Sequence, residues 1–590
     1  MVLLQSYKHN IINDNSRFRP QNLSPEWRFK FQIFSNIYYM NFNIQYENPD
    51  ESLLTRLFKV RGIQDDPENF LNPKLADYWL DPFLLNDMEI AVERINKAVR
   101  DWEKIMIFGD YDVDGVTSSR LLYRFFTKFL NYKNVSIQYP DRIKDGYGMK
   151  NNHIDEMKAK WVNLIITVDN WIASINEALY TKEKWIDLII TDHHKEHDEI
   201  PQAFAVINPQ ISSKYPFKWL AGVGVAFKLM NAILSRSNFS SEEKNLIFNY
   251  FLPIVAIWTV ADIVPLVQEN RVIVKRWLEL INTQRHKLAT SIRWFLDYLN
   301  LRDNVDTFHI WFVIGPRINA WWRIKSPYDS LRALLYTWEK QYEHLVKVDE
   351  VNNERKKLQE KAFKIAEQII DHSNNILIAA DEGFHEWVVW IVAGKMTERY
   401  NKPSVVFKID TEREMAVASL RGPEYFNIIQ MLGEAESMLI RFWWHKQAWW
   451  LAVKLDRIEE FKEFMKDYCN KNITEENLKK TLKIDTQIYA HEWNNESLSD
   501  IEKLAPFGEG NKEPVFIINN LKIKKVEKVW KNWWAHLKIH GELDWKKLTS
   551  MFWSKWSESE KFDMDEISVV GKIKKDSYNG WFFMDGMDWR

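Results

Sequence analysis

The chain has 590 residues, and this length predicts about three to five domains. Hydrophobic residues make up 46% and charged residues 27% of the chain, so large cores can form and a largely disordered protein is excluded. The net charge of −2 confines any contact with nucleic acid to local basic patches, and the single cysteine, Cys469, excludes a disulfide framework and fits a reducing, cytoplasmic environment.

The first half of the chain alternates between helical and strand-like patterns. Residues 1–40 are polar and aperiodic and lack the basic head and apolar stretch of a secretory signal. Residues 1–50 are expected to form a poorly structured N-terminal segment. Short apolar runs at 104–108, 163–168 and 187–191 are separated by helical stretches, and no apolar run reaches the roughly 18 residues of a membrane span. This alternation predicts a doubly wound α/β domain with a parallel sheet over residues 51–339.

The second half of the chain predicts three further parts. Residues 340–372 contain neither glycine nor proline and are rich in charge, so we expect one long connecting helix there. Apolar runs at 375–380 and 404–409 indicate a second α/β domain over residues 373–470. Short alternating strands over residues 471–590 predict a small β-barrel of the oligonucleotide-binding (OB) type.

A basic strip lies in the expected barrel. Eight lysines between residues 521 and 548 stand against three acidic residues, Glu527, Glu542 and Asp544. On a barrel, such a strip would follow the backbone of a single-stranded nucleic acid without reading its sequence. A merely solvated face of the barrel is the alternative interpretation.

Acidic and imidazole side chains follow three of the expected strands. They are Asp110, Asp112 and Asp114 after the first strand, Asp169 after the second, and Asp192, His193 and His194 after the third. Because the carboxyl ends of parallel strands meet at one edge of a sheet, these side chains should lie close together. Several carboxylates cannot stay ionised at close range without a cation, and hard divalent metal ions prefer oxygen ligands. The sequence therefore predicts a metal site at this edge.

Glycine and tryptophan occur in unusual amounts. Glycine occurs 18 times, where ordinary usage of about 7% predicts roughly 41. Tryptophan occurs 29 times and forms four adjacent pairs, where random placement gives roughly one. Several of these tryptophans stand beside turn residues, where glycine is ordinary and an aromatic core is no explanation. We hypothesise that many of them are encoded by UGA and are glycine in the native organism.

The ordered motifs of the chain resemble a known family. GDYDVDG (109–115), VDN (168–170) and TDHH (191–194) are similar to motifs of the DHH phosphoesterase superfamily. A longer series resembles its RecJ family of exonucleases: PDRIKDGYGM (140–149), LAGVGVAFKL (220–229), TVADIVPL (259–266), ENR (269–271), IGPRINA (314–320), FHEWVVWIVA (384–393), SLRG (419–422), RFWWHKQAWWLAV (441–453) and LAPFGEGNKEPVF (504–516). The resemblance runs from about residue 55 to at least residue 540.

This resemblance implies a site and an activity. It implies that Asp169 bridges two Mn²⁺ or Mg²⁺ ions, that Asp114, His193 and Asp262 hold one ion, and that Asp110 and Asp112 surround the other. His194 would orient a ligand or donate a proton. The implied substrate-binding residues are Arg142, Tyr147, Arg317, Asn319, Ser419, Arg421 and His445. The implied activity is 5′→3′ degradation of single-stranded DNA to mononucleotides by a cytoplasmic monomer in recombination and repair, with a single-strand-binding protein and a helicase as partners.

The chain departs from the family pattern at glycine positions. The family has glycine where this chain has Trp171, Trp258, Trp322, Trp387, Trp390, Trp443, Trp444 and Trp450. Indoles would fill positions at which the backbone must approach a ligand closely. Reassignment of UGA explains the composition and these departures together.

Two alternative functions stay open on the sequence. The first is a phosphodiesterase of the same superfamily for short oligonucleotides or cyclic dinucleotides. Such relatives generally lack the terminal barrel, which favours a polymeric substrate. The second is an inactive scaffold that only binds DNA, which would require the tryptophans to be the native residues.

Overall fold

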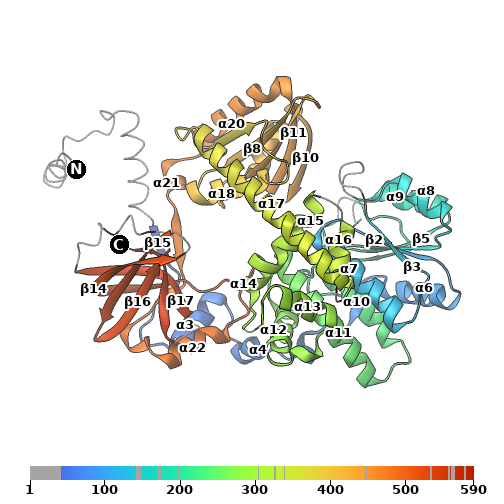
Figure 1. Ribbon diagram of the computed structural model, residues 1–590, viewed down its shortest axis with the longest axis horizontal. Coiled ribbons are helices and arrows are strands. Elements are labelled where there is room, and N and C mark those ends of the chain that lie inside the picture. Colours follow the sequence, from blue (N-terminus) through green and yellow to red (C-terminus); the bar gives the residue numbers. More distant parts are fainter. Residues whose placement is uncertain are drawn as a thin grey trace. The chain divides into compact units, whose positions relative to one another are not determined.

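The computed structural model (Figure 1) describes residues 41–140, 148–170, 174–195, 199–302, 304–324, 327–337, 339–445, 448–531, 534–553, 555, 559, 565–576 and 580–589. Contacts divide the chain into two compact units. One consists of the chain up to Glu47 with Leu358–Gln487, and the other consists of Asn48–Lys357 with Ile488–Arg590.

A parallel sheet forms the centre of the larger unit. Its strands in spatial order are β3 (Val135–Gln138), β2 (Ile105–Gly109), β4 (Leu164–Val168), β5 (Asp187–Thr191) and β6 (Ala205–Ile207). The apolar runs of β2 and β4 are buried throughout, as expected for a parallel sheet covered on both faces. The predicted parallel α/β sheet is thus confirmed. The strand order reverses between β2 and β4, and ligands of doubly wound sheets bind at such a reversal.

The larger unit contains many helices, some of which cover the two faces of this sheet. In chain order they and the short helical turns are α3 (Leu53–Arg61), α4 (Pro67–Leu71), α5 (Leu75–Tyr78), η2 (Pro82–Leu84), α6 (Met88–Arg100), α7 (Val113–Arg124), η3 (Phe125–Phe129), α8 (Asn151–Ala159), α9 (Ile175–Glu183), α10 (Gly222–Ser235), α11 (Ser241–Ala261), α12 (Gln268–Thr283), η4 (Arg285–Lys287), α13 (Thr290–Tyr298), α14 (Thr307–His309), η5 (Ile310–Ile314), α15 (Gly315–Ile324) and α16 (Pro327–Leu335). Ile105 and Ile107 of β2 belong to one apolar core, whereas Met106 and Phe108 belong to a second core. Alternate residues of β2 therefore pack on opposite faces of the sheet.

One helix bears on the expectation about membranes. Among the described helices, α11 alone is long and apolar enough to cross a membrane by length and composition, and 61% of its apolar window is buried in the structure. Phe251, Ile254 and Trp258 of this helix lie in the core beside the central sheet. The sequence suggested no run of this length because polar residues interrupt the apolar ones near the beginning of the helix.

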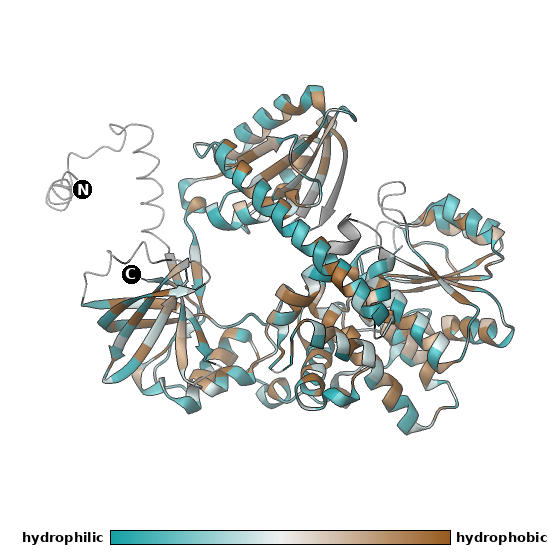
Figure 2. Ribbon diagram, in the orientation of Figure 1, coloured by the Kyte–Doolittle hydropathy of each residue, from teal (hydrophilic) through white to brown (hydrophobic). Residues whose placement is uncertain are grey.

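The smaller unit contains a second sheet, whose order is β10 (Leu439–His445), β11 (Ala448–Lys454), β9 (Met415–Arg421), β8 (Ser404–Asp410) and β7 (Leu377–Asp381). β7 and β8 are parallel, and the other neighbours are antiparallel. Its helices are α18 (Val389–Tyr400), α19 (Ile428–Glu434), η6 (Glu436–Met438), η7 (Leu455–Arg457), α20 (Ile458–Asn472) and α21 (Glu475–Leu478). β1 (Asn41–Ile44) pairs in parallel with β12 (Thr481–Ile484). The expected long helix is present as α17 (Glu339–Ile369), along which hydrophilic residues predominate (Figure 2).

The C-terminal strands form the expected barrel. After η8 (Ala490–Glu492) and α22 (Asn495–Lys503), the strands are β14 (Phe516–Lys531), β15 (Trp534–Leu543), β16 (Lys546–Phe552), β17 (Glu566–Lys575) and β18 (Phe582–Trp589). They follow the order β13 (Thr486–Gln487), β14, β15, β16, β18 and β17, and pairing of β14 with β17 closes the barrel. The five-part division of the chain, with bounds after residues 50, 339, 372 and 470, stays a proposal.

Four tryptophans have left-handed backbone conformations. Trp102, Trp161, Trp185 and Trp545 have φ angles of 56°, 60°, 58° and 68°. Their side chains are 59%, 82%, 88% and 91% exposed. A bulky residue at positive φ is a conformational outlier, whereas glycine adopts this region freely. Exposed indoles supply little packing to offset this cost.

The local structures around these tryptophans are ones that favour glycine. Trp161 N–H donates to Lys158 O and Val162 N–H donates to Met157 O, both at 3.0 Å, which is the paired hydrogen bonding of a Schellman motif at the end of α8. The same pattern recurs where α6 and α9 end, at Trp102 and Trp185. Trp545 follows Asp544 in the two-residue loop between β15 and β16, where both residues have positive φ and Asp-Gly is the favoured pair.

Candidate metal centre

The acidic motif after β2 begins at the reversal of the strand order. Asp110 follows the last residue of the strand and is buried. Asp112 is the N-cap of α7, and its Oδ1 accepts a hydrogen bond from Gly115 N–H at 3.0 Å. A Cβ on Gly115 would lie 2.4 Å from the Asp110 carbonyl oxygen, so only glycine allows this tight strand-to-helix turn. The alternating aspartates of the GDYDVDG motif are thus placed around one turn of the chain.

The third carboxylate of this motif is fixed by a second helix. Asp114 is buried in the first turn of α7. Its Oδ2 accepts from Gly222 N–H at 2.6 Å and its Oδ1 from Val223 N–H at 2.9 Å, both at the N-terminus of α10. These amides and the positive end of the helix dipole stabilise the ionised carboxylate. A Cβ on Gly222 would lie 2.8 Å from Asp169 Oδ1, so glycine also keeps the space between the two carboxylates open.

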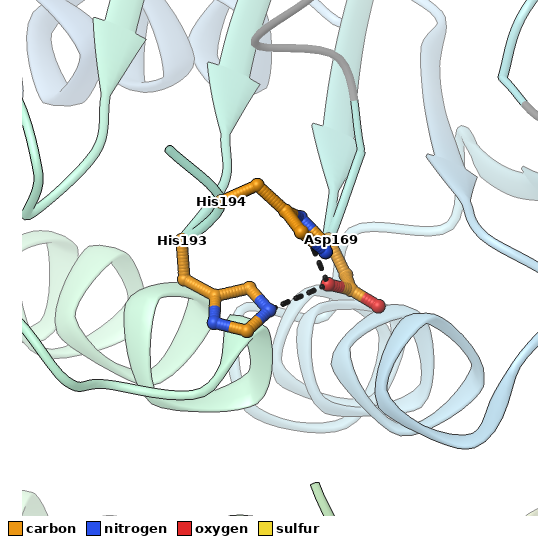
Figure 3. A group of neighbouring side chains, drawn as sticks. All are labelled: Asp169, His193 and His194. Atoms are coloured by element: carbon orange, nitrogen blue, oxygen red, sulfur yellow. Dashed lines mark ion pairs between the residues drawn. The ribbon is translucent and has the colours of Figure 1, made fainter. Parts of the chain in front are cut away.

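The ends of β4 and β5 bring two histidines to the same place. Figure 3 shows Asp169 facing His193 and His194, whose nearest ring nitrogens lie 3.2 Å and 4.0 Å from Asp169 Oδ1. Asp169 itself has a φ of 56° directly after β4. Its Oδ1 is buried and accepts no hydrogen bond from the part of the chain that the structure describes. A buried carboxylate oxygen without a donor is the kind of ligand that a cation would satisfy.

Asp262 completes the cluster from the other side. It is the C-cap of α11, and its Oδ2 lies 3.8 Å from His193 Nε2, which is also 3.9 Å from Asp114 Oδ2. Three groups have ligand atoms within 4.8 Å of one another: Asp114 with His193 and Asp262, Asp110 with Asp112 and Asp169, and Asp169 with His193 and His194. The first two groups are the two ligand sets expected from the sequence.

The crowding of these carboxylates changes their ionisation. Burial raises the pKa of Asp114 to about 7, and the neighbouring charge of Asp112 adds to the rise. Burial also raises the pKa of Asp169 and of Asp262, and in both the Asp114 charge contributes next. Such a cluster holds protons unless positive charge is supplied, and divalent cations supply it. The donor set therefore fits hard divalent metal ions.

Asp192 has a role that the sequence reading missed. Its Oδ1 accepts from the backbone N–H groups of His193 and His194, at 2.7 Å and 3.2 Å, and lies 2.8 Å from His194 Nδ1. Burial lowers the pKa of His194, but the Asp192 carboxylate outweighs this and raises that pKa to about 9. Asn208 Nδ2 donates to His194 O at 2.9 Å, which fixes the same loop. The aspartate of the TDHH motif was the available signal.

The expected substrate-binding residues of the larger unit are only partly described. Arg142 and Tyr147 lie outside the described residues. Arg317 on α15 donates to Asp349 Oδ1 at 2.7 Å and to Val313 O at 2.7 Å, so its guanidinium is already paired. Asn319 lies two residues further along α15 and is half-buried.

Ser419 and Arg421 lie together on β9 of the smaller unit. Arg421 Nη1 donates to Ser419 Oγ at 3.2 Å, and burial lowers the pKa of its guanidinium to about 10. Among the described residues, no carboxylate forms an ion pair with Arg421. A half-buried guanidinium of this kind suits an anionic ligand. His445 ends β10, but its side chain is not among those described.

Two of the tryptophans at family glycine positions, Trp258 and Trp450, lie beside these groups. Trp258 is buried on α11, one turn before Asp262, and its carbonyl oxygen accepts from Asp262 N–H at 2.9 Å. Its indole nitrogen has no hydrogen-bond partner among the described residues. Trp450 lies directly opposite Ser419 in the β9–β11 pair. Trp387 and Trp390 flank the beginning of α18 and are half-buried. The side chains of Trp171, Trp322, Trp443 and Trp444 are not described.

Comparisons with known proteins identify the family. Residues 104–257 match the DHH family, N-terminal domain, and residues 484–581 match the RecJ OB domain. The single-stranded-DNA-specific exonuclease RecJ of Bacillus subtilis (strain 168) is 32% identical over 89% of this chain, which spans 66% of that relative. The RecJ of Dickeya dadantii (strain 3937) is 30% identical over 80% of this chain and 84% of its own length. The chain belongs to the RecJ family.

Solved RecJ structures share the fold. The crystal structure of RecJ from Thermus thermophilus in complex with Mn²⁺ has a TM-score of 0.78 at 22% identity, covering 93% of this chain and 79% of that one. The Mg²⁺ complex of the same RecJ has a TM-score of 0.73 at 20% identity. The RecJ resemblance drawn from the motifs is therefore confirmed, and so are the DHH-type sheet and the OB-type barrel.

Proposed function

We propose that this RecJ-family chain is a metal-dependent exonuclease that degrades single-stranded DNA. The observation that carries the proposal is the convergence of Asp110, Asp112, Asp114, Asp169, His193 and Asp262 at the reversal of the central sheet. The unsatisfied, buried Oδ1 of Asp169 marks the centre of this cluster. Relatives with this sequence pattern are named single-stranded-DNA-specific exonucleases.

The cluster is suited to two divalent cations, Mn²⁺ or Mg²⁺. Asp169 would bridge them, with Asp114, His193 and Asp262 on one side and Asp110 and Asp112 on the other. When bound, such a pair of cations activates water and stabilises the negative charge that develops during displacement at phosphorus. The chain contributes by fixing the ligands, above all through the two amides of α10 that hold Asp114.

His194 is proposed to hold a proton beside the reacting phosphate. Its side chain is 34% exposed, so substrate can reach it. Asp192 occupies Nδ1, which leaves Nε2 to supply a proton to the leaving oxygen. Asp192 is then the residue that sets the tautomer and the orientation of the ring.

End recognition is proposed for the arginines. Arg317 and Arg421 would hold the terminal 5′-phosphate and the adjacent backbone. Further contacts with the DNA would come from Arg142, Tyr147, Asn319, Ser419 and His445. The planar guanidinium matches phosphate oxygens bidentately. By resemblance to the family, the proposed direction is 5′→3′, with mononucleotide products.

Replacing Arg421 with Ala should reduce kcat/KM on 5′-phosphorylated strands roughly ten- to a hundredfold, because hydrogen bonds to a charged group contribute about 1.5–3 kcal/mol. Arg317→Ala should have a smaller effect, because Asp349 already holds that guanidinium. Steady-state digestion of matched strands with and without 5′-phosphate measures the preference. Arg413→Ala is the control, since this exposed side chain pairs with Glu386. An unchanged 5′-phosphate preference in the Arg421 variant would contradict the assignment.

The terminal barrel is proposed to hold the strand. Of the eight lysines in the basic strip, Lys522 and Lys524 lie within 4.0 Å of Glu566 and Glu542, and Lys525 pairs with Glu527. These ion pairs reduce the positive electrostatic potential of the basic strip. Lys538 on β15 and Lys547 on β16 lie on one face of this strand pair by register, and they are proposed to contact phosphate groups.

A double variant with Lys538 and Lys547 changed to Gln should bind long single strands with a log–log salt slope smaller by about 1.4 units, since each lost phosphate contact removes about 0.7. Lys503→Gln, an exposed lysine paired with Asp500, is the control. Fluorescence titration over a salt series provides the slopes. Equal slopes for the double variant and the parent would leave the strip as a solvated face. Deleting everything after residue 470 is less suitable, because Leu53 and Leu57 share the barrel core and would be exposed.

The two alternative functions differ in their substrates. A phosphodiesterase for short oligonucleotides or cyclic dinucleotides would prefer those compounds, and a scaffold would bind DNA without cleaving it. With Mn²⁺ present, we expect higher kcat/KM on a long single strand than on a dinucleotide or a cyclic dinucleotide, because only the long strand reaches the barrel. Preference for the dinucleotide would overturn this choice. We also propose that the protein is a cytoplasmic monomer and that its partners are a single-strand-binding protein and a helicase.

A further inference from the structure

The ENR motif was recognised in the sequence but has no part in the site so far. Glu269, Asn270 and Arg271 begin α12 and are all buried, with 1%, 0% and 2% of their surface exposed. Buried charged residues are rare unless they are bonded. The motif follows Asp262 by only a few residues, so its contacts act on the segment that carries a proposed metal ligand.

Glu269 and Asn270 connect this segment to the rest of the cluster. Glu269 Oε1 accepts from Lys228 Nζ at 2.5 Å, and Lys228 lies on α10, the helix whose N-terminus binds Asp114. Asn270 Nδ2 donates to Pro265 O at 3.0 Å and to Trp219 O at 2.5 Å, just before α10. One side of the motif therefore contacts α10 and the segments just before α10 and α12.

Arg271 faces the other way, toward the barrel. Its guanidinium donates to Phe70 O at 3.0 Å, to Ala505 O at 3.0 Å and to Pro506 O at 3.4 Å, and it lies 3.8 Å from the centre of the Phe70 ring. Among the described residues no carboxylate pairs with it, and burial lowers its pKa to about 10. A desolvated guanidinium that binds only carbonyl groups depends on those carbonyls staying in position.

The partner segment, residues 504–511, is fitted closely against the residues after Asp262. Leu266 N–H donates to Glu509 O at 2.7 Å, and Thr307 Oγ1 donates to Phe507 O at 2.6 Å. A Cβ on Gly508 would lie 2.6 Å from Leu266 Cδ1. Buried Asn511 closes the segment on itself by donating to Leu504 O and Pro506 O, both at 2.9 Å. This segment leads directly into β14 of the barrel.

We propose that residues 504–511 form a latch that fixes the C-terminal barrel to the segment carrying Asp262, and that Arg271 is its positioning residue. The inference rests on the proposed function. A single strand held by the barrel would then span a constant distance between the barrel and the metal ligands. The latch matters for long strands, which contact both places, and not for very short ones, which contact the metal ligands alone.

The test compares the full-length Arg271→Met variant with its parent, both carrying glycine at the eight family glycine positions, on a long single strand and on a trinucleotide. We expect KM for the long strand to rise at least tenfold while kcat/KM on the trinucleotide stays within twofold. Arg276→Met, on the exposed side of the same helix and paired with Glu279, should change neither value. Arg271→Lys should give an intermediate KM, because an ammonium cannot reach all three carbonyls. Equal losses on both substrates, or no loss on either, would overturn the proposal.

Amide hydrogen exchange provides a readout independent of activity and folding yield. In Gly508→Ala, exchange should increase together in residues 262–267 and 504–511, and adding Leu266→Ala should reverse the increase, because it removes the methyl group that the new Cβ meets. Exchange that changes in only one of the two segments would overturn the latch. A parent that cleaves neither substrate but shows the coupled exchange would contradict the proposed function and leave the latch supported.

Discussion

Replacing Trp171, Trp258, Trp322, Trp387, Trp390, Trp443, Trp444 and Trp450 with glycine is expected to convert a poorly soluble, inactive chain into a folded enzyme. Overpacking typically costs about 1–3 kcal/mol at each site, and the total free energy of unfolding is only about 5–15 kcal/mol. Trp258 illustrates the cost, because its buried indole nitrogen lacks a hydrogen-bond partner among the described residues. Solubility and hydrolysis of single-stranded DNA by the two chains are the measurements.

The left-handed tryptophans give a second, independent test. Trp161→Gly, Trp185→Gly and Trp545→Gly should each raise the free energy of unfolding by about 1 kcal/mol, because the left-handed region costs an L-residue about 1–2 kcal/mol. Trp79→Gly is the control and should lower it, since that indole packs against Phe227 and Lys228. Denaturant unfolding of the single variants, each made in the chain with glycine at the eight family glycine positions, provides the values.

Peptide mass spectrometry of the protein from its native organism decides the matter. We expect glycine masses at the eight motif positions and at the four left-handed positions. Indole masses there would refute the reassignment of UGA and revive the inactive scaffold.

Asp169→Ala is expected to reduce hydrolysis more than a hundredfold, because even residues that only orient metal ligands contribute about 10–100-fold and Asp169 belongs to two ligand groups. Its loss would leave two cations facing each other without the bridging charge. The measurement is degradation of single-stranded DNA in the presence of Mn²⁺, with the variant made in the chain that carries glycine at the eight family glycine positions. Asp155→Ala, an exposed carboxylate paired with Lys184, is the control. Activity within tenfold of the parent would exclude the bridging role.

Much of the site could be predicted from the sequence because it depends on strand ends. Apolar runs followed by acidic residues define both the strands and the edge where those residues meet, so Asp110, Asp114, Asp169 and His193 were identifiable without coordinates. Asp262 came only from the resemblance, because it ends a helix and no strand pattern marks it.

Other contacts depend on long-range packing that no local pattern specifies. The amides of Gly222 and Val223 bind Asp114 across more than a hundred residues of chain, and Arg271 reaches carbonyl groups in the segment before the barrel. The ion pairs that partly neutralise the lysine strip depend on the register of the strands, which could not be predicted from the sequence. The tryptophans in the left-handed region could be recognised only from the backbone angles of the structure.

The most direct test of the proposed activity is digestion of a 5′-end-labelled single strand and its duplex by the protein from its native organism, with and without Mn²⁺. We expect immediate release of labelled mononucleotide from the single strand, dependence on Mn²⁺, and little release from the duplex. Intact single strands in the presence of Mn²⁺, or equal digestion of the duplex, would contradict a metal-dependent, single-strand-specific exonuclease.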